Sequence, residues 1–257
     1  MTPIADILAA ATPTGTGFTA DIPAGWLQGR TAYGGLSSAI ALHAAQQCEA
    51  DLPPLRSAQV AFIGPLAGDI TVTATKLRRG RNAAFIQSDI VSEAGLGYRA
   101  TFVFMSDQPS KLDFDQRPPV DRQPPAPDTK VFTGPEELFI HHFNFLDLKD
   151  RLAPGELLRW ARLRDTAGLD PMVQIMAVAD ALPPAVIRLL GGGFPPVSSL
   201  TWILNMLTAN PSTTNDWWLL SAKSDFARNG CSSQTMRIWN ADGQLMAEGM
   251  QSVAIFA

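Results

Sequence analysis

The segment from Asp170 to Leu182 constrains the fold most, because it predicts a helix with almost no polar face. Asp170 is a favoured residue type for a helix N-cap, and Pro171 is favoured at the first helical position. The apolar residues that follow leave no side for solvent, so we expect this helix to be buried on most sides. Asp180 is the one carboxylate beyond the N-cap, and burial without a partner is costly and raises a carboxyl pKa. From the pattern alone, Asp180 either meets water or a donor at a helix end, or it has a function.

The first half of the chain predicts one helix followed by several strands. Residues 36–47 have helical spacing, and their many Ser and Ala side chains would let a sheet wrap closely around the helix. Strand-like runs rich in β-branched and aromatic residues follow at 57–66, 70–79, 83–92 and 96–106. This order predicts an α+β arrangement in which a curved antiparallel sheet covers one helix.

The second half repeats this order of elements. Strand-like runs lie at 139–148 and 156–165 before the apolar helix, and at 198–207, 217–227, 232–244 and 245–256 after it. We therefore predict a tandem duplication, with an N-terminal repeat at 1–106, a Pro-rich linker at 107–129 and a C-terminal repeat at 130–257.

Hairpin turns at Gly95 and Gly243 fix an offset of 243 − 95 = 148 residues between the two repeats. The same offset pairs Gln251 with Val103, since 251 − 148 = 103. The two repeats are therefore expected to differ chemically, with polar residues kept in the second.

Composition excludes several classes of function. Charged residues make up 17% of the chain and the net charge is −4, which argues against nucleic acid as a partner. The sequence predicts no membrane span, because no apolar run approaches the required length of roughly 18 residues. Cys48 and Cys231 are far apart, so no disulfide framework or metal-ligand spacing is present and a cytoplasmic location is predicted. The Arg-rich segments 78–81 and 159–164 leave two interpretations open, solvated strand ends or contact with an anionic ligand.

Common catalytic motifs are missing from the sequence. It contains no Gly-x-Ser-x-Gly nucleophile elbow, no P-loop and no dinucleotide fingerprint, so no cofactor is predicted. His141 and His142 are expected to alternate across a strand and so to point to opposite faces, which excludes shared metal binding. His43 lies on the helical stripe and is expected to be a packed residue or part of a tunnel lining, and no metal site is predicted.

Two copies of a helix wrapped by an antiparallel sheet resemble the double hotdog fold. The chain resembles the double-hotdog acyl-CoA thioesterases, of the acyl-CoA thioesterase II type and the thioesterase-like superfamily, over essentially its whole length. The order and spacing of the markers carry this resemblance: Tyr33-Gly34-Gly35, Leu77-Arg78-Arg79-Gly80-Arg81, Ala179-Asp180, Ser198-Ser199-Leu200, Trp218-Leu219-Leu220 and Gln251.

The resemblance implies a hydrolase that cleaves fatty acyl-CoA, an enzyme of fatty acid metabolism. By position, Asp180, Ser199 and Gln251 would hold and activate a water molecule. The backbone N–H groups of Gly34 and Gly35 are candidate donors to the oxyanion that develops on the thioester. Direct attack by Asp180 through an anhydride remains an open alternative.

Three departures from the family pattern bear on activity. Thr201 stands where an acidic residue is common, and Asn205 and Leu207 stand where aromatic or His residues are frequent. Pro183-Pro184 follows Asp180 closely. A non-catalytic or weakly active acyl-CoA binder therefore stays open, as does a hotdog hydratase or dehydratase, which would need a His beside the Asp. A homo-oligomer is also expected, because wide sheets leave edges and faces to cover.

Overall fold

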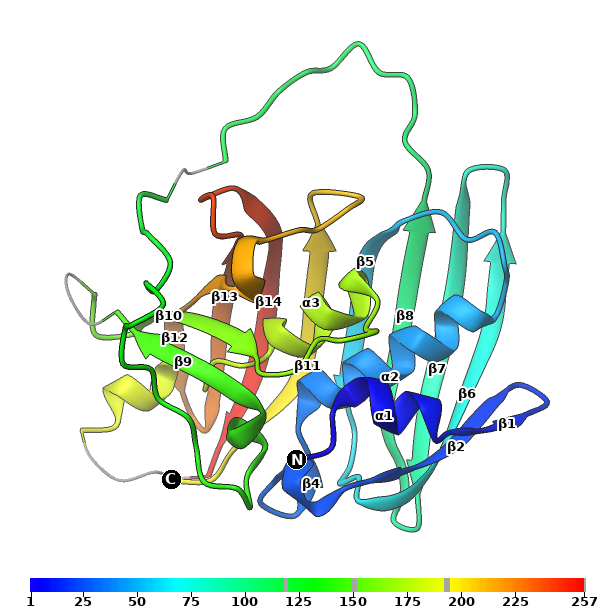
Figure 1. Cartoon of the computed structure of the whole chain (residues 1–257), viewed down its shortest axis with the longest axis horizontal. Helices are drawn as coiled ribbons and strands as arrows, with labels where there is room; N and C mark the ends of the chain where they lie inside the picture. Colours follow the sequence, from blue (N-terminus) through cyan, green and yellow to red (C-terminus); the bar gives the residue numbers. More distant parts are fainter. Residues whose placement is uncertain (118–119, 149–151, 192–194, 257) are drawn as a thin grey trace.

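The protein folds around one continuous antiparallel sheet. The computed structural model describes residues 1–117, 120–148, 152–191 and 195–256. The main sheet has 12 strands in the order β1-β2-β6-β7-β8-β5-β11-β14-β13-β12-β10-β9. Figure 1 shows the central helices α2 and α3 next to each other on one side of this sheet. Fold class and duplication therefore agree with the sequence prediction, but the two sheets are joined into one.

The elements of the first half are α1 (Ile4–Ala9), β1 (Thr12–Thr14), β2 (Gly17–Ile22), η1 (Ala24–Trp26), β3 (Leu27–Gln28), β4 (Thr31–Ala32), α2 (Gly34–Gln47), β5 (Leu55–Phe62), β6 (Gly68–Arg79), β7 (Ala83–Ser92) and β8 (Gly95–Met105). Those of the second half are η2 (Phe139–His142), β9 (Phe143–Asp147), β10 (Glu156–Leu163), α3 (Pro171–Ala179), η3 (Ala185–Leu189), β11 (Val197–Met206), η4 (Thr214–Asp216), β12 (Trp218–Arg228), β13 (Cys231–Trp239) and β14 (Leu245–Ile255).

Strands β5 and β11 join the two halves at the centre of the sheet. They pair antiparallel, with Gln59 opposite Ile203 and Ser57 opposite Asn205. The Ser57 hydroxyl donates to Asn205 Oδ1 at 2.9 Å across this junction. The first strand of each repeat after its central helix is therefore the one that meets the other repeat.

The predicted correspondence between Val103 and Gln251 is wrong by one residue. Gln251 is buried, whereas Val103 is only half-buried and pairs with the exposed Phe85 on the outer face. Phe102, fully buried, is the inward residue beside it. The β7–β8 hairpin closes at Ser92↔Gly95 while the β13–β14 hairpin closes at Trp239↔Leu245, so one constant offset cannot align both. Because side chains alternate along a strand, a shift of one residue exchanges the faces.

The central helices begin and end close to the predicted residues. Helix α2 starts at Gly34, two residues before the predicted start, and its Ser and Ala side chains are buried under the sheet. Helix α3 begins as predicted, with the Asp170 carboxylate accepting from the N–H groups of Met172 and Val173. It ends at Ala179, and Asp180 occupies the C-cap with non-helical ψ. The helix is therefore shorter than the apolar segment. Helical backbone is disfavoured at a residue that precedes proline, and Pro183 follows soon after the helix end.

Stacked rings connect the halves near the start of α2. His142 stacks on Trp26 with ring centroids 3.8 Å apart, and Phe139 stacks on Tyr33 at 4.3 Å. Both second-half residues belong to η2, so the predicted strand starts only at Phe143.

The two adjacent histidines consequently do not alternate across a strand. His141 Nδ1 lies 2.9 Å from the Gly134 carbonyl oxygen, and its Nε2 lies 3.0 Å from Arg164 Nη1. Among the described residues, no group of three or more His, Cys, Asp or Glu side chains could hold a metal ion.

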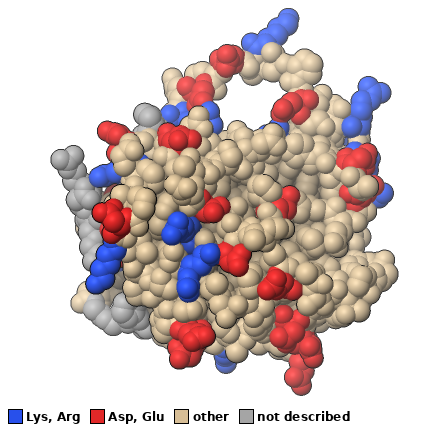
Figure 2. All heavy atoms as spheres, viewed as in Figure 1, with Lys and Arg blue, Asp and Glu red and all other residues tan. Residues whose placement is uncertain are grey.

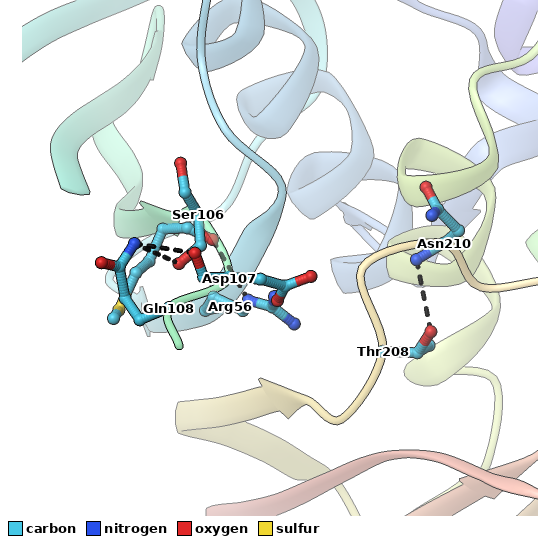
Figure 3. A network of polar contacts seen from close by, with 7 residues as sticks. Arg56, Ser106, Asp107, Gln108, Thr208 and Asn210 are labelled. Atoms are coloured by element: carbon cyan, nitrogen blue, oxygen red, sulfur yellow. Dashed lines mark hydrogen bonds and ion pairs between the residues drawn. The ribbon is translucent and has the colours of Figure 1, made fainter. Parts of the chain in front are cut away.

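The Pro-rich segment after β8 arches away from the body of the molecule (Figure 1). Its described residues between 107 and 129 contain neither helix nor strand. Figure 3 shows Arg56 of β5 beside the start of this segment, where its guanidinium pairs with Asp107 and donates to the Met105 carbonyl oxygen at 3.2 Å. Further along, Arg117 donates to the Leu245 carbonyl oxygen at 3.1 Å. The segment is thus fastened to both halves.

Most of the Arg side chains in the two basic segments contact local partners. Arg79 pairs with Asp51 at 3.2 Å, Arg159 pairs with Asp147, and the Arg162 guanidinium lies over the Trp217 ring at 4.7 Å. Acidic and basic side chains are interspersed on the face shown in Figure 2. These contacts favour the interpretation of the basic segments as strand ends over their interpretation as a site for an anionic ligand.

No helix in the described part of the chain is long and apolar enough to cross a membrane. Cys48 is half-buried, Cys231 is exposed, and both are free thiols.

Candidate active site

Asp180 lies where the end of α3 meets the start of α2. The two helices run antiparallel: Tyr33 Oη donates to the Ala177 carbonyl oxygen at 2.7 Å at one end, and Gln46 Nε2 donates to Asp170 Oδ1 at 3.1 Å at the other. The Asp180 carboxylate therefore faces the N-terminus of α2, where the helix dipole and free N–H groups favour negative charge.

Gly34 and Gly35 make this close approach possible. A Cβ on Gly34 would lie 2.6 Å from Asp180 Oδ2 and 2.8 Å from the Phe62 ring. A Cβ on Gly35 would collide with the Ala177 carbonyl oxygen and the Tyr33 ring. Neither glycine has a positive φ, so space rather than backbone conformation requires glycine here.

The environment of Asp180 raises its carboxyl pKa to about 7, chiefly through burial. Hydrogen bonds from Gln251 and from the Gly35 backbone oppose this rise because they favour the charged form. The residue keeps part of its surface accessible to solvent. A carboxylate with a pKa near neutrality is a stronger base than a surface Asp and is still ionised in a large fraction of molecules.

Gln251 brings the last strand to this carboxylate. Its Nε2 donates to Asp180 Oδ1 at 3.1 Å, and its side chain is only 2% exposed. In β14 it lies opposite Trp202 of β11 and Gln234 of β13. The structure therefore brings together two of the three residues that the sequence predicted.

Ser199 faces the same side of the sheet as Gln251 because of a β-bulge. The register shifts between Ser199 and Thr201, so that Ser199 pairs with the buried Val253 and points inward. Ser199 itself is half-buried. Within the described residues, no hydrogen bond joins its hydroxyl to Asp180 or to Gln251. Ser199 therefore shares a side of the sheet with Gln251 but makes no direct hydrogen bond to the carboxylate among the described residues, and its role stays a prediction.

Gly35 also lies beside the carboxylate. Its backbone favours the charged form of Asp180 and so opposes the rise in the carboxyl pKa. Gly34, the first residue of α2, also lies against the carboxylate, and its N–H is one of those without a partner inside the helix.

Two buried tyrosines complete the surroundings of Asp180. Tyr98 Oη donates to Ser38 Oγ at 3.0 Å, and Ser38 Oγ donates to the Gly34 carbonyl oxygen at 2.9 Å. Burial raises the pKa of both Tyr98 and Tyr33, and the charge of Asp180 raises each further, so both phenols remain protonated. Tyr98 carried no signal in the sequence, since it occupies an ordinary inward position of a strand.

Two surface cavities, of about 510 and 250 Å³, lie apart from Asp180, Ser199 and Gln251. The larger is lined by Asp21, Asp69 and Glu93 among others at the β2–β6 edge, and the smaller by His43 and Asp170 under α1.

Comparison with known families identifies the chain. Residues 22–105 match the family described as acyl-CoA thioesterase N-terminal domain, and residues 114–255 match its C-terminal domain. The chain belongs to the acyl-CoA thioesterase family. It is thus a member of a family of thioester hydrolases, as the resemblance predicted. The sequence matches none of the curated proteins with which it was compared.

Solved structures show the same fold over the whole chain. A conserved protein of unknown function with the hot dog fold from Alicyclobacillus acidocaldarius is 21% identical, with a TM-score of 0.85 over 100% of this chain and 99% of the other. The tesB protein of Mycobacterium avium subs paratuberculosis is 17% identical, with a TM-score of 0.79 over 99% of both chains. Acyl-CoA thioesterase II TesB2 from Mycobacterium marinum is 17% identical, with a TM-score of 0.76 over 98% of this chain and 97% of the other.

The departures from the thioesterase pattern lie mostly outside the site. Thr201 is exposed and follows the bulge, so it points to the outer face of the sheet. Leu207 is 36% exposed and lies just beyond the end of β11. Neither residue is placed against the Asp180 carboxylate.

Proposed function

We propose that this thioesterase hydrolyses fatty acyl-CoA to a free fatty acid and CoA, with Asp180 as the general base. The observation that carries the proposal is the contact of 3.1 Å between Gln251 Nε2 and Asp180 Oδ1, at a carboxyl group whose pKa is raised to about 7. A water molecule beside this pair could be deprotonated at neutral pH.

The chemistry balances with these groups alone. Asp180 takes a proton from the water, and the hydroxide oxygen bonds to the thioester carbonyl carbon. The tetrahedral intermediate collapses, the C–S bond breaks, and the thiolate of CoA takes the proton from Asp180. Gln251 holds the carboxylate and the water in orientation, and Ser199, which points to the same side of the sheet, supplies a hydroxyl that can donate and accept.

Gly34 is the proposed oxyanion donor. The N–H groups of a helix N-terminus can stabilise a developing negative charge, and Gly34 opens α2 beside Asp180. Gly35 is proposed to hold the carboxylate instead. Because Gly34 belongs to 1–106 while Asp180, Ser199 and Gln251 belong to 130–257, we expect either repeat alone to be inactive.

The positions of the histidines favour hydrolysis over hydration. A hydratase would need a His beside the carboxylate, but His142 stacks on Trp26 and His141 contacts Gly134 and Arg164. His43 Nε2 lies 2.8 Å from Gln47 Nε2, toward the other end of α2.

Release of free thiol from acyl-CoA substrates of increasing chain length tests the proposal. Asp180→Asn keeps the shape but removes the base, so kcat should fall about 100-fold or more. Asp69→Asn, at an exposed strand position, is the matched control and should leave the rate unchanged. Binding of a non-hydrolysable acyl-CoA thioether without any thiol release by the wild type would instead identify an acyl-CoA binder.

A nucleophilic Asp180 is separated from a general base by a single turnover in H₂¹⁸O. An anhydride opened at the Asp180 carbonyl carbon would leave ¹⁸O in that carboxyl group, and one opened at the acyl carbon would be detected as an acylated Asp180 by mass spectrometry after rapid quenching. Direct attack by water gives neither signal and places ¹⁸O only in the fatty acid. The homo-oligomer also stays a prediction, which molar mass from light scattering would test.

A further inference from the structure

Gln234 extends the hydrogen bonds at Asp180 by one more side chain. It lies in β13 directly opposite Gln251 in β14 and is 2% exposed. Its Nε2 donates to Gln251 Oε1 at 2.7 Å, and its Oε1 accepts from the backbone N–H of Ala185 at 2.8 Å. A chain of donors therefore runs from Ala185 through both glutamines to Asp180.

We propose that Gln234 is a positioning residue that holds the Gln251 amide with its NH₂ group toward Asp180. The inference deepens the proposed function and rests on it for its catalytic meaning.

The Ala185 N–H, at the far end of this series of hydrogen bonds, determines which group donates and which accepts in each of them. A side-chain amide has nearly the same shape in its two flipped orientations, so shape alone does not orient Gln251. A backbone N–H can only donate, and therefore Ala185 requires Gln234 to present Oε1 toward it. Gln234 then presents Nε2 to Gln251, and Gln251 in turn must accept there and donate to Asp180.

The sequence after α3 supplies the anchor. Asp180 is followed by Ala181-Leu182-Pro183-Pro184, which brings Ala185 to the start of η3. Ala185 is fully buried, and its N–H belongs to the first turn of this helix, where N–H groups have no intrahelical partner. Gln234 Oε1 satisfies it. The early proline break thus places the donor that orients the two glutamines.

A flipped Gln251 would impair the site in two ways. Its Oε1 would then face Asp180 Oδ1, and two acceptors without a proton between them repel each other. The carboxylate would lose a bond that favours its charged form, and the water would lose the fixed partner that aligns it with the base.

Gln234→Glu gives the sharpest test because it keeps the size of the side chain. A protonated Glu can still accept from Ala185 and donate to Gln251, whereas an ionised Glu can only accept. Activity should therefore rise with deprotonation of Asp180 and fall again as the introduced carboxyl ionises, giving a bell-shaped pH profile. Above pH 8 we expect kcat/KM to be about 10- to 100-fold below the wild type, mainly through kcat. Gln59→Glu, the same replacement on the exposed face of β5, is the matched control and should keep the wild-type profile.

Gln234→Leu provides a second variant in case the glutamate version does not fold. It should lower kcat by a similar factor on the alkaline plateau, where Asp180 is ionised, and should not produce an alkaline fall. Wild-type rates and pH profiles for both Gln234 variants would overturn the inference.

A direct titration separates this inference from the proposed function. The Asp180 carboxyl can be followed by ¹³C NMR whether or not the protein releases thiol. We expect its midpoint to rise by about half a pH unit or more in Gln234→Leu and to stay unchanged in Gln59→Glu. Failure of thiol release with a shifted midpoint would reject hydrolysis and keep the positioning role, while active enzyme with an unshifted midpoint would reject only the role of Gln234.

Discussion

Gln251 Nε2 lies 3.1 Å from Asp180 Oδ1 and joins the final strand of the chain to the end of the second central helix. The two residues are 71 positions apart in the sequence. Their contact depends on the register of β14 in the sheet and on the end of α3 at Ala179. The candidate site thus exists only when strand pairing and helix docking are both complete.

Replacing Gln251 tests this contact directly. In Gln251→Leu the carboxylate loses the side-chain hydrogen bond that favours its charged form, so the pKa of Asp180 should rise above about 7. We expect kcat to fall about 100-fold and the acidic limb of the pH–rate profile to move to higher pH. An unchanged acidic limb would show that the hydrogen bond does not control the titration of Asp180. Met250→Leu, on the exposed side of the same strand, serves as the control.

Asp180 should also make the stability of the fold depend on pH. Its pKa is about 7 in the folded protein and 3.8 in the reference state, so the folded state binds the proton more tightly. Stability should therefore be highest at acidic pH with respect to this group and decrease as pH rises from about 4 to about 7. The loss is at most about 4 kcal/mol, and residual solvent contact reduces it.

Urea unfolding at pH 5 and pH 8 measures this dependence. Asp180→Asn cannot ionise, so it should lose the alkaline decrease and be more stable than the wild type at pH 8. Equal pH dependence in the two proteins would contradict a raised pKa for Asp180.

The two glycines at the start of α2 should tolerate replacement by alanine much less well than a glycine with open space around it. Gly35→Ala places a Cβ against the backbone of Ala177, which cannot move without shifting α3, so we expect destabilisation of about 1–3 kcal/mol or more. Gly34→Ala meets the Asp180 carboxylate and the Phe62 ring, and it should reduce activity more than stability. Gly15→Ala has open space around its Cβ and is the matched control. Thermal unfolding and thiol release of the three variants check this order.

The sequence predicted the local elements well because their signals are local. Asp170 and Pro171 mark the start of α3, and the Ser and Ala residues of α2 mark a helix under a close sheet. The position of Asp180 followed from the family pattern, while its pKa follows from packing that no pattern displays. The sharp end of the helix at Ala179 reflects the prolines that follow, which the sequence did contain.

Register and long-range pairing were not readable from the sequence. The bulge beside Ser199 turns its side chain inward, and the residues Ser198-Ser199-Leu200 give no sequence signal for a bulge. The two hairpin turns close differently, so the constant offset wrongly paired Val103 with Gln251. Gln234 was missed for a related reason: one glutamine in a strand reads as polar surface until the register places it opposite Gln251.

His142 should destabilise the fold at acidic pH, opposite in direction to Asp180. Burial against Trp26 lowers the pKa of His142 to about 4, so the folded protein keeps this imidazole neutral where the unfolded chain would take up a proton. Stability should fall as pH decreases from about 6.5 to about 4, because the unfolded state then binds more protons. The groups around His142 that influence this titration are His141, Arg164, the N-terminal amine and the Gly25 backbone.

In His142→Phe the ring can still stack on Trp26 but cannot titrate, so urea unfolding should show a smaller loss of stability between pH 6.5 and 4. Asp180→Asn should retain that acidic decrease in full, since its own titration lowers stability only as pH rises. If His142→Phe instead kept the wild-type slope, the acid sensitivity would have to arise from other groups.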